Sequence, residues 1–525
     1  MGPDGRLIIA QAVPSFQLQQ TLGVAYTIKR AGASNCDDTT WQREHAPEDE
    51  LITGMASMIK RAFVLASLCW STSLGAQNNA MPPESERQLA RAIYKEMIES
   101  RSGYTTGATT PLVEAVARRL KAAGFPAADI FVGGASPKKA NLVVRYHGNG
   151  RARPMLLLAH TDVVEAKRED WSTDPFVLIE KDGYFYGRGV GDDKSQAAVW
   201  IANLIRYKKE GFKPDRDIIV ALTADEEGGG PFNGVEWLLK NKRELIDAEL
   251  CLNEGGWGES VNGTRLSNDV QVSEKYVVNY RLDVHNKGGH SSLPVADNAI
   301  YHLAGALDRL SRFGFPLKLN DVTRGYFLAM SGIEKGAVST DLAAVARGDT
   351  AAMRRIAQGS TPWNATLRTT CVATQLEGGH AKNALPQLAA ANVNCRVLPE
   401  DTLEAITASL KRVIADTAVT LTIDGTPRPG APSPMRNDLL TAVKAITTSM
   451  WPGVQTVPMM VMGGTDGSYL RAGGIPTYGV QGFFYDRDDI RFHGRDERLK
   501  VQSFYEGQTF LYQLVKRMAG GTPTA

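Results

Sequence analysis

Four polar segments that each follow a short apolar run constrain this chain more than any other feature. They are LLLAHTD ending at Asp162, GRGVGDDKS around Asp192, IIVALTADEEGGG with Glu226 and Glu227, and ELCLNEGG with Glu254. Each apolar run predicts a buried strand, and residues 194–207 and 235–239 predict helices between them, which together make a βαβ-like unit. In an open α/β sheet, ligands bind beyond the carboxyl ends of the strands. We therefore expect the four loops to converge on one site.

The side chains in these loops are those of a metal site. One histidine and several carboxylates, without cysteine, suit zinc among the hydrolytic metals, with manganese or cobalt as alternatives. Carboxylates that are taken out of water together also need cations to pair with them. Any one of these acids alone could equally be a solvated loop residue. Four loops at strand ends instead indicate a shared site.

The spacing within the first two loops predicts roles. His160 and Asp162 lie two residues apart on an extended chain and so point the same way. We predict that His160 is a metal ligand and that Asp162 holds its other ring nitrogen. Asp192 lies directly before a predicted helix, where it could simply be a helix cap. We predict instead that its two oxygens bridge two cations and that Asp193 is the cap.

The adjacent residues Glu226 and Glu227 predict the reaction. Neighbouring side chains at a strand end point in different directions, so one can bind metal while the other faces the attacking water. Two-metal hydrolysis needs such a pair, because the cations lower the pKa of water and a free carboxylate takes and returns its proton. We predict Glu226 as general base and Glu227 as ligand, with Glu254 as a further ligand. The alternative is a solvated acidic pair before glycines.

The last ligand is expected from the far end of the chain. The sequence has eight histidines, and His493 lies in a terminal loop among acids that could orient it. We predict that His493 completes the site, which requires the chain to return to the first domain.

The middle of the chain has the pattern of a second domain. From Tyr276 the order β-α-β-β-α-β is typical of the ferredoxin-like unit. We expect this domain to span residues 276–427, with an insertion at 313–364 that contains one more helix. The first domain then has two parts, 82–275 and 428–520. The predicted fold class is α/β, with a mixed, mostly parallel sheet beside the smaller ferredoxin-like domain.

Length and charge narrow the partners. A chain of 525 residues exceeds what a single core usually organises. Its hydrophobic fraction of 43% and charged fraction of 22% are typical of soluble globular proteins. The net charge of +2 and the lack of a long basic run give no case for nucleic acid or an anionic membrane as partner. We expect a small-molecule substrate.

A secretory pattern begins inside the chain. Met55 and Met58 precede two basic residues, the apolar run AFVLASLCW and then small residues. The apolar run is too short to span a bilayer. We predict that translation starts at Met55 or Met58, that residues 55–76 are a signal peptide and that 1–54 are a non-native extension. The protein would then be exported, to a bacterial periplasm. The alternative is a buried helix inside a long N-terminal extension.

An oxidising compartment bears on the cysteines. Cys36 and Cys69 would be lost with the leader, which leaves Cys251, Cys371 and Cys395. Cys371 and Cys395 flank a predicted hairpin, so they either form a disulfide or remain two buried thiols.

Seven motifs, in chain order, resemble those of one known family. AHTD, GDDKS, ADEEGG, NEGG, GGHSSLP, NALP and FHGRDE are similar to the motifs of metallopeptidase family 20. That co-catalytic zinc family includes bacterial glutamate carboxypeptidase, aminoacylase, carnosinase-like dipeptidases and succinyl-diaminopimelate desuccinylase. The resemblance covers roughly residues 82–519. It implies a zinc-peptidase-like catalytic domain with an inserted lid and dimerisation domain, and hence a homodimer.

The resemblance also implies the site residues. One metal ion would be held by His160, Asp192 and Glu254, and the other by Asp192, Glu227 and His493. Glu226 matches the catalytic base of the family. Asp162 matches the aspartate that orients the first histidine.

Five further residues match substrate-binding positions of the family. In the family, the histidine that matches His290 in GGHSS often reaches the active site of the other subunit to stabilise the tetrahedral oxyanion. Asn383 in NALP and Arg396 in NCRVLP match substrate-binding residues, and an arginine fork suits a carboxylate. Gly464 and Thr465 in GGTDG resemble a substrate-facing loop, although a tight turn also explains the glycines.

These observations predict an exported two-metal hydrolase that cleaves an amide or peptide bond next to a free carboxylate, of carboxypeptidase or dipeptidase type. An N-acyl amino acid amidohydrolase is the alternative, and the motifs do not separate the two. A related aminopeptidase type lacks a domain like the segment 276–424. A non-catalytic binding protein on the same fold would usually lack a ligand or the base, and all of these residues are present.

Overall fold

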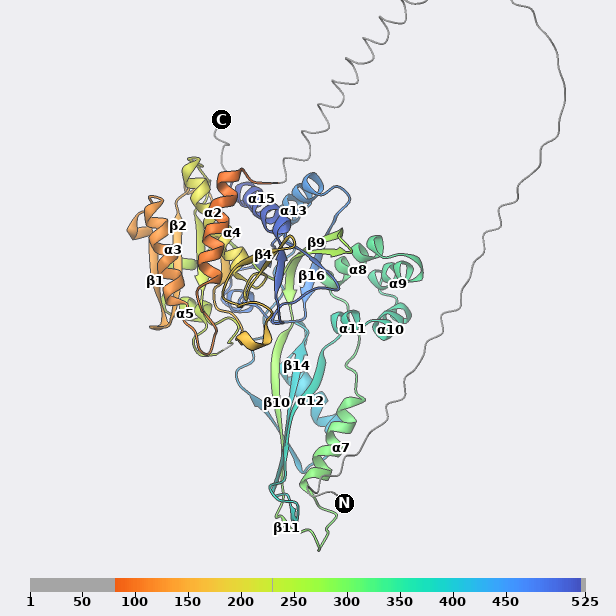
Figure 1. Cartoon of the computed structure of the whole chain (residues 1–525). Coiled ribbons are helices and arrows are strands. Elements are labelled where there is room, and N and C mark those ends of the chain that lie inside the picture. Colours follow the sequence, from red (N-terminus) through yellow and green to blue (C-terminus); the bar gives the residue numbers. More distant parts are fainter. Residues whose placement is uncertain (1–80, 229, 521–525) are drawn as a thin grey trace, which may run out of the picture. The chain divides into compact units, whose positions relative to one another are not determined.

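A mixed sheet forms the core of the computed structural model, which describes residues 81–228 and 230–520 (Figure 1). Within those residues it has ten strands in the order β1-β2-β6-β3-β7-β17-β9-β8-β18, with β16 paired to β9. The strands are β1 (Ile130–Ser136), β2 (Lys139–Tyr146), β3 (Met155–His160), β6 (Ile218–Thr223), β7 (Leu250–Asn253), β8 (Gly258–Val261), β9 (Thr264–Glu274), β16 (Gln455–Val461), β17 (Thr477–Gly479) and β18 (Phe484–Asp486).

The three central strands β6, β3 and β7 are neighbours and run parallel. Every residue in them is buried, because both faces of the sheet are covered. Leu157 and Val220 pack into the core on one face, while Leu156 and Ile219 pack into the core on the other. The prediction of buried strands from these apolar runs is confirmed. Their carboxyl ends meet at one edge of the sheet.

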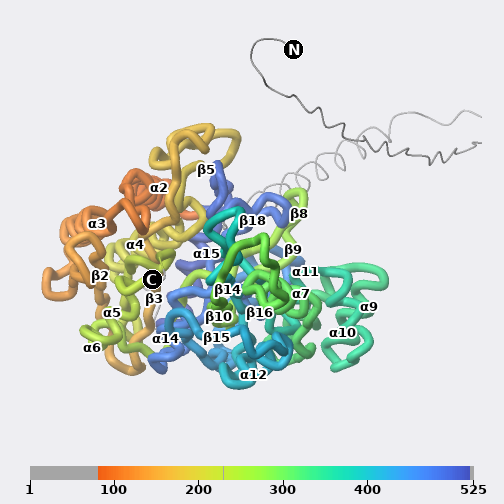
Figure 2. The backbone as a smooth tube through the Cα atoms, turned by 90° about the horizontal axis from the view of Figure 1, so that it is seen from below, coloured from red at the N-terminus to blue at the C-terminus, as the bar shows by residue number. Residues whose placement is uncertain are grey.

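Helices from both ends of the described chain cover this sheet. They are α2 (Glu84–Ile98), α3 (Thr110–Ala122), α4 (Lys194–Lys209), α5 (Gly234–Asn241), α6 (Arg243–Ile246), α13 (Asn437–Met450), α14 (Gly467–Ala472) and α15 (Val501–Ala519), with 3-10 turns η2 (Ala127–Asp129) and η3 (Arg168–Asp170). Helix α4 packs against α2 and α15 (Figure 2). Because residues on all sides of α4 are buried there, it is a rigid support for the loop before it.

The expectation that Asp192 follows a strand of the main sheet is wrong. The strand before it, β5 (Tyr184–Tyr186), pairs with β4 (Ile179–Lys181) and β19 (Arg498–Lys500) in a separate three-stranded sheet. The intervening segment is rich in glycine, and Gly189 adopts φ +87° where a Cβ atom would meet Val163 and Lys194. The chain therefore turns here.

A second, antiparallel sheet lies in the middle of the sequence. It has the order β12-β14-β10-β15 and is built from β10 (Tyr276–His285), β12 (Thr370–Gly378), β14 (Leu388–Val397) and β15 (Val419–Asp424). Helices α7 (Ala299–Ser311) and α12 (Leu403–Ile414) share one apolar core with it. The predicted β-α-β-β-α-β order is confirmed, and so is the α/β class with a large mixed and a small antiparallel sheet. The exact domain bounds 82–275, 276–427 and 428–520 stay predictions.

The insertion at 313–364 differs from the prediction of one helix. The structure has four helices there: α8 (Asp321–Ile333), α9 (Gly336–Ala346), α10 (Thr350–Gly359) and α11 (Thr361–Leu367). The helices are short, and Asn320, Asp349 and Ser360 each cap the start of one with a side-chain oxygen. They share a small core of their own, and α8 also packs on β16.

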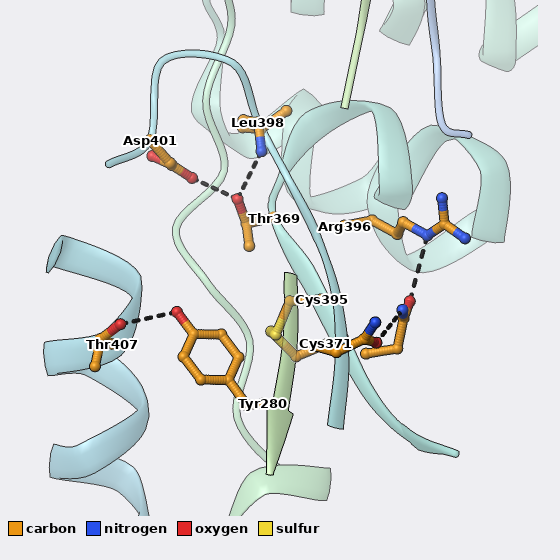
Figure 3. The surroundings of a disulfide bond; sticks show 10 residues. Tyr280, Thr369, Cys371, Cys395, Arg396, Leu398, Asp401 and Thr407 are labelled. Atoms are coloured by element: carbon orange, nitrogen blue, oxygen red, sulfur yellow. Dashed lines mark hydrogen bonds between the residues drawn. A yellow bond between two sulfur atoms is a disulfide. The ribbon is translucent and has the colours of Figure 1, made fainter. Parts of the chain in front are cut away.

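Cys371 and Cys395 form a disulfide between β12 and β14 (Figure 3). The two residues are directly opposite each other in the strand register. Of the two alternatives, the disulfide is therefore correct and the pair of buried thiols is not. Cys251 is a buried free thiol.

The predicted extension 1–54, signal peptide 55–76 and start at Met55 or Met58 lie outside the described residues. Among the described helices, none combines the length and the apolar character needed to cross a bilayer.

Candidate metal centre

Three neighbouring strand ends bring most of the predicted ligands together. His160 is the last residue of β3, and Glu254 follows the end of β7. Glu226 and Glu227 follow β6 after a turn at Asp225, which has a positive φ of 62°. A buried ion pair between the carboxylate of Asp225 and Lys139, 2.7 Å long, holds that turn in place. The sheet thus fixes these side chains at a common edge.

Asp192 lies between two histidines. Its Oδ1 is 2.9 Å from Nε2 of His160, and its Oδ2 is 3.1 Å from Nε2 of His493. The loop with His493 thus returns to the loops after β3, β6 and β7, although it lies about three hundred residues further along the chain. One carboxylate with a histidine at each oxygen has the arrangement expected of a bridge between two cations.

Each histidine also has a glutamate as neighbour. Nε2 of His493 is 3.0 Å from Oε1 of Glu227, and Nε2 of His160 is 3.8 Å from Oε2 of Glu254. Two overlapping triads have all their ligand atoms within 4.8 Å of one another: His160 with Glu226 and Glu254, and His160 with Asp192 and Glu227. The geometry therefore includes Glu226 in the cluster as well.

The charged groups of the cluster shift one another's pKa values. Burial raises the pKa of Glu226 and of Glu254 well above the usual value, and neighbouring carboxylates raise both further. Burial would lower the pKa of His160, but the bond to Asp192 and the other acids nearby raise it well above normal. Hydrogen bonds to Asp192 and Glu227 raise the pKa of His493 to about 10. The cluster is an acid-rich site removed from water.

This donor set fits divalent cations. Two imidazoles and four carboxylates, without a thiolate, match the ligands of zinc, cobalt and manganese in hydrolytic sites. Burying so many acids together is costly unless cations neutralise them. The described residues thus contain a candidate metal-binding group.

Asp162 differs in one respect from the prediction. Nδ1 of His160 donates to the backbone carbonyl of Asp162 at 3.0 Å, whereas the Asp162 carboxylate is 3.8 Å away. That carboxylate instead accepts the backbone N–H groups of Glu226 at 3.2 Å and Glu227 at 3.0 Å. Asp162 therefore orients the histidine mainly through its peptide group and holds the two glutamates through its side chain.

The prediction that Asp193 caps α4 is wrong. Asp193 occupies the residue before the helix, but its side chain makes no capping bond. Its Oδ1 instead accepts a hydrogen bond from Nε2 of Gln481 at 3.2 Å. The carboxylate is thus turned toward the core.

Three buried charged residues beside the cluster were not predicted: Arg188, Asp466 and Glu497. Asp466 accepts bonds from Oγ1 of Thr223 at 2.9 Å and Nδ2 of Asn233 at 2.6 Å. Burial raises the pKa of Asp466 to about 6. The available signal was proximity, since each of the three lies within four residues of a residue already assigned to the site.

Two predicted substrate residues meet at the end of the small sheet. Strand β11 (Gly289–His290) pairs with β13 (Ala384–Leu385), and the N–H of Ser291 donates to the carbonyl of Asn383 at 3.0 Å. Figure 1 shows β11 at the tip of the small sheet, away from the main sheet. His290 is exposed, and its Nδ1 lies 2.7 Å from the hydroxyl of Ser292. Its other nitrogen faces no partner among the described residues.

The other three predicted substrate residues lie elsewhere. Arg396 is half-buried on β14, and its Nε donates to Oδ1 of Asn394 at 3.3 Å (Figure 3). Burial lowers the pKa of its guanidinium. Gly464 is exposed, whereas Thr465 is buried and donates its hydroxyl to Glu274 at 2.8 Å. Within the described residues, no hydrogen bond or ion pair joins the five substrate candidates to the cluster.

Comparisons with known proteins give the context for this geometry. A family model described as peptidase family M20/M25/M40 matches residues 156–517. The N-fatty-acyl-amino acid synthase/hydrolase PM20D1 of Homo sapiens is 28% identical over 388 residues, which cover 69% of this chain and 74% of that protein. Aminoacylase-1 of Mus musculus is 26% identical over 388 residues, which cover 72% of this chain and 83% of that protein.

A solved structure shares the fold. The M20 family metallo-carboxypeptidase Sso-CP2 from Sulfolobus solfataricus superimposes with a TM-score of 0.63 at 15% sequence identity. The match covers 81% of this chain and 98% of the other. Both sheets of the present structure therefore belong to an architecture seen before.

Proposed function

Because this chain belongs to peptidase family M20/M25/M40, we propose that it is a two-metal hydrolase that cleaves an amide or peptide bond next to a free carboxylate. The family is one of metallopeptidases and metal-dependent amidohydrolases, and the chain has the metal-binding group such an enzyme needs. The observation that carries the proposal is the position of Asp192 between His160 and His493.

The contacts support the proposed ligand sets. His160, Asp192 and Glu254 would hold one cation, and Asp192, Glu227 and His493 the other. Zinc suits these donors best, with cobalt or manganese as alternatives. Two cations there would supply Lewis acidity, which lowers the pKa of water and polarises the carbonyl to be cleaved.

Glu226 is the proposed proton carrier. It shares a triad with His160 and Glu254 but is not needed for either ligand set. A desolvated carboxylate among other acids accepts a proton more readily than an exposed one. Glu226 can therefore take a proton from the attacking water and return it to the leaving amine. Asp162 supports this role because it holds the backbone N–H of Glu226.

The substrate carboxylate is assigned to the small sheet. Within the described residues no acid pairs with the guanidinium of Arg396, and only its Nε is used by Asn394. The two outer nitrogens of Arg396 thus remain for a bidentate contact with a carboxylate. Asn383 and His290 lie beside each other at the tip, at the opposite end of β14 from Arg396. We therefore assign both to the substrate bound by the other subunit, with His290 at the oxyanion. Gly464 and Thr465 would belong to a loop that faces the substrate.

A homodimer accounts for the position of His290. It lies at the tip of the small sheet, so a second subunit offers it a route to an active site (Figure 1). Strand β12 forms one edge of that sheet, and its side chains Val372 and Leu376 are 61% and 70% exposed. An edge strand with apolar, exposed side chains is a ready surface for pairing with another strand. We propose that two copies meet along β12.

Hydrolysis of N-acyl amino acids is the second candidate function. PM20D1 and aminoacylase-1, to which the chain is similar over about 70% of its length, are named for reactions of acylated amino acids. Such substrates share with dipeptides an amide bond beside a free carboxylate. The same cluster would serve both reactions, and the shape of the acyl-side pocket would decide between them.

A substrate screen tests both functions. Dipeptides, folyl-type glutamates and amino acids with short or long N-acyl chains are incubated with the protein, before and after chelation and after return of zinc, cobalt or manganese. We expect metal-dependent cleavage of one class and little cleavage of the same compound with its carboxylate amidated. Full activity without metal, or equal turnover of the amidated compound, would contradict the proposal.

A further inference from the structure

A buried ion pair lies directly behind the candidate metal centre. Nη1 of Arg188 is 2.7 Å from Oε2 of Glu497, and the two side chains are 3% and 1% exposed. The free energy needed to remove two charges from water exceeds the free energy of their attraction unless their remaining polar atoms are also hydrogen-bonded. The other bonds of this pair are therefore informative about what it supports.

Glu497 holds the loop that carries Asp192. Its Oε1 accepts the backbone N–H groups of Gly191 at 2.7 Å and Asp192 at 3.2 Å. Its Oε2 accepts the backbone N–H of Gly189 at 3.2 Å in addition to the bond from Arg188. A single carboxylate thus fixes the backbone of the whole segment that leads to Asp192.

Arg188 holds the loop that carries His493. Its Nη2 donates to the backbone carbonyls of His493 at 3.2 Å and Gly494 at 3.0 Å. His493 has a left-handed backbone with φ 60°, a conformation that a residue with a side chain keeps only when its surroundings hold it. The Arg188 guanidinium is part of that support.

We propose that Arg188 and Glu497 are a positioning pair that sets the spacing between Asp192 and His493, and thereby the affinity for the second of two cations. The inference rests on the proposed function, because it takes these residues as ligands. Each member of the pair bonds backbone atoms of the loop that contains the other. The pair consequently holds together two loops that are far apart in the sequence.

The effect should differ between the two cations. His160 and Glu254 lie at the ends of the buried strands β3 and β7. Among the described residues, neither Arg188 nor Glu497 has a hydrogen bond or ion pair to those strands. The second cation, by contrast, takes both Asp192 and His493 from the tied loops. Loss of the pair should therefore weaken binding of the second cation more than binding of the first.

The test is Glu497→Gln in the full chain. Glutamine keeps the shape of the side chain, but its NH₂ group would face N–H donors that bond a carboxylate oxygen in the wild type. Some of those bonds would therefore be lost. Stepwise titration of metal-free protein with zinc by calorimetry, and with cobalt by visible absorption, measures the two affinities separately. We expect one of the two steps to lose affinity by about 10- to 100-fold, with a smaller change in the other step.

Glu506→Gln is the matched control. Glu506 is also buried, pairs with Arg265 and accepts a bond from Nε1 of Trp451 at 3.0 Å. This variant should lower the melting temperature without changing either metal affinity. Arg188→Lys is the second variant, because it keeps the charge but cannot reach Glu497 and both carbonyls at once. If Glu497→Gln does not fold, the affinity of Arg188→Lys for the second cation decides.

The outcomes separate the two ideas. Wild-type protein that binds fewer than two cations would contradict the proposed function. If the wild type binds two cations and the folded variant binds both with wild-type affinity, the positioning role is overturned. An equal loss at both steps would overturn it as well.

Discussion

Asp192 has a histidine at each of its carboxylate oxygens, 2.9 Å from His160 and 3.1 Å from His493. A short side chain can serve two cations only if its loop is held firmly, and backbone bonds to Glu497 provide that here. Glu226 differs from it, because neither proposed ligand set requires it. The proposed chemistry thus divides two tasks, metal binding and proton transfer, between side chains in one buried cluster.

Glu226→Gln separates these two tasks. The amide keeps the size of the side chain but cannot accept the proton, so turnover should fall by about three orders of magnitude or more. Metal content, measured by elemental analysis, should stay at two ions per chain. Loss of one ion would instead identify Glu226 as a ligand, and unchanged turnover would remove it from the mechanism.

Asp269 should make stability depend on pH. It is buried on β9, its Oδ1 has no partner among the described residues, and burial raises its pKa to about 7. Between about pH 4 and 7 the folded state therefore holds a proton that the unfolded chain has lost. The free energy of unfolding should fall as pH rises through this window, by about 1.4 kcal/mol per pH unit from this residue.

Asp269→Asn should remove that contribution. Urea unfolding at pH 5, 6, 7 and 8 measures it as the difference in slope between wild type and variant. The exposed acid Asp308, changed to Asn, is the control and should leave the slope unchanged. A variant with the wild-type slope would show that Asp269 does not titrate in this range.

At the scale of elements, the small sheet has a covalent bond between neighbouring strands. The disulfide between Cys371 on β12 and Cys395 on β14 closes a segment whose ends are 24 residues apart. The segment includes β13, which pairs with the strand that carries His290. The bond therefore restrains an edge strand and the substrate candidates near it.

Loss of this disulfide should destabilise the protein. A loop of this length predicts a contribution of about 3 kcal/mol through the entropy of the unfolded chain. The Cys371→Ser, Cys395→Ser variant should unfold at lower denaturant concentration than oxidised wild type. A reducing agent should shift the wild type and leave the variant unchanged; an equal response of both would show that the bond is not formed.

For the whole molecule, the open edge β12 is the surface along which we propose that two copies associate. Leu376→Lys places a charge on that edge and should shift the protein from dimer to monomer in sedimentation. Leu328→Lys on α8 is the matched control, since Leu328 is also strongly exposed, and it should remain a dimer. A monomeric wild type, or a dimeric Leu376→Lys variant, would contradict association through β12.

The proposed role of His290 would connect assembly with catalysis. His290→Ala should lower turnover without changing metal content. If the histidine acts on the other subunit, mixing His290→Ala with Glu226→Gln protein should restore activity, because a mixed dimer combines one intact base with an intact histidine from its partner. Full activity of His290→Ala alone would reject the role, and no restoration on mixing would place the histidine in its own subunit.

Local patterns predicted much of this protein. The apolar runs that become β3, β6 and β7, the alternation along β10 and the apolar positions of α4 are properties of consecutive residues, so they can be recognised without the fold. The position of polar residues after such runs likewise predicted the meeting of His160, Glu226 and Glu254. The short helices of the insertion were miscounted because caps such as Asn320 and Asp349 are weak signals in sequence.

Tertiary structure decided most of the contacts between distant segments, although the return of His493 to the first domain was expected from the sequence. The partners of several side chains depend on which atoms lie within reach in the folded chain and not on sequence spacing. The Asp162 carboxylate accepts the backbone N–H groups of Glu226 and Glu227. Asp193 accepts a bond from Gln481, and Arg188 pairs with Glu497 about three hundred residues away. A hydrogen bond depends on atoms that the folded chain brings within about 3 Å. The sequence by itself therefore determined which chemistry is present, and the packing of the sheet and loops determined which atoms share it.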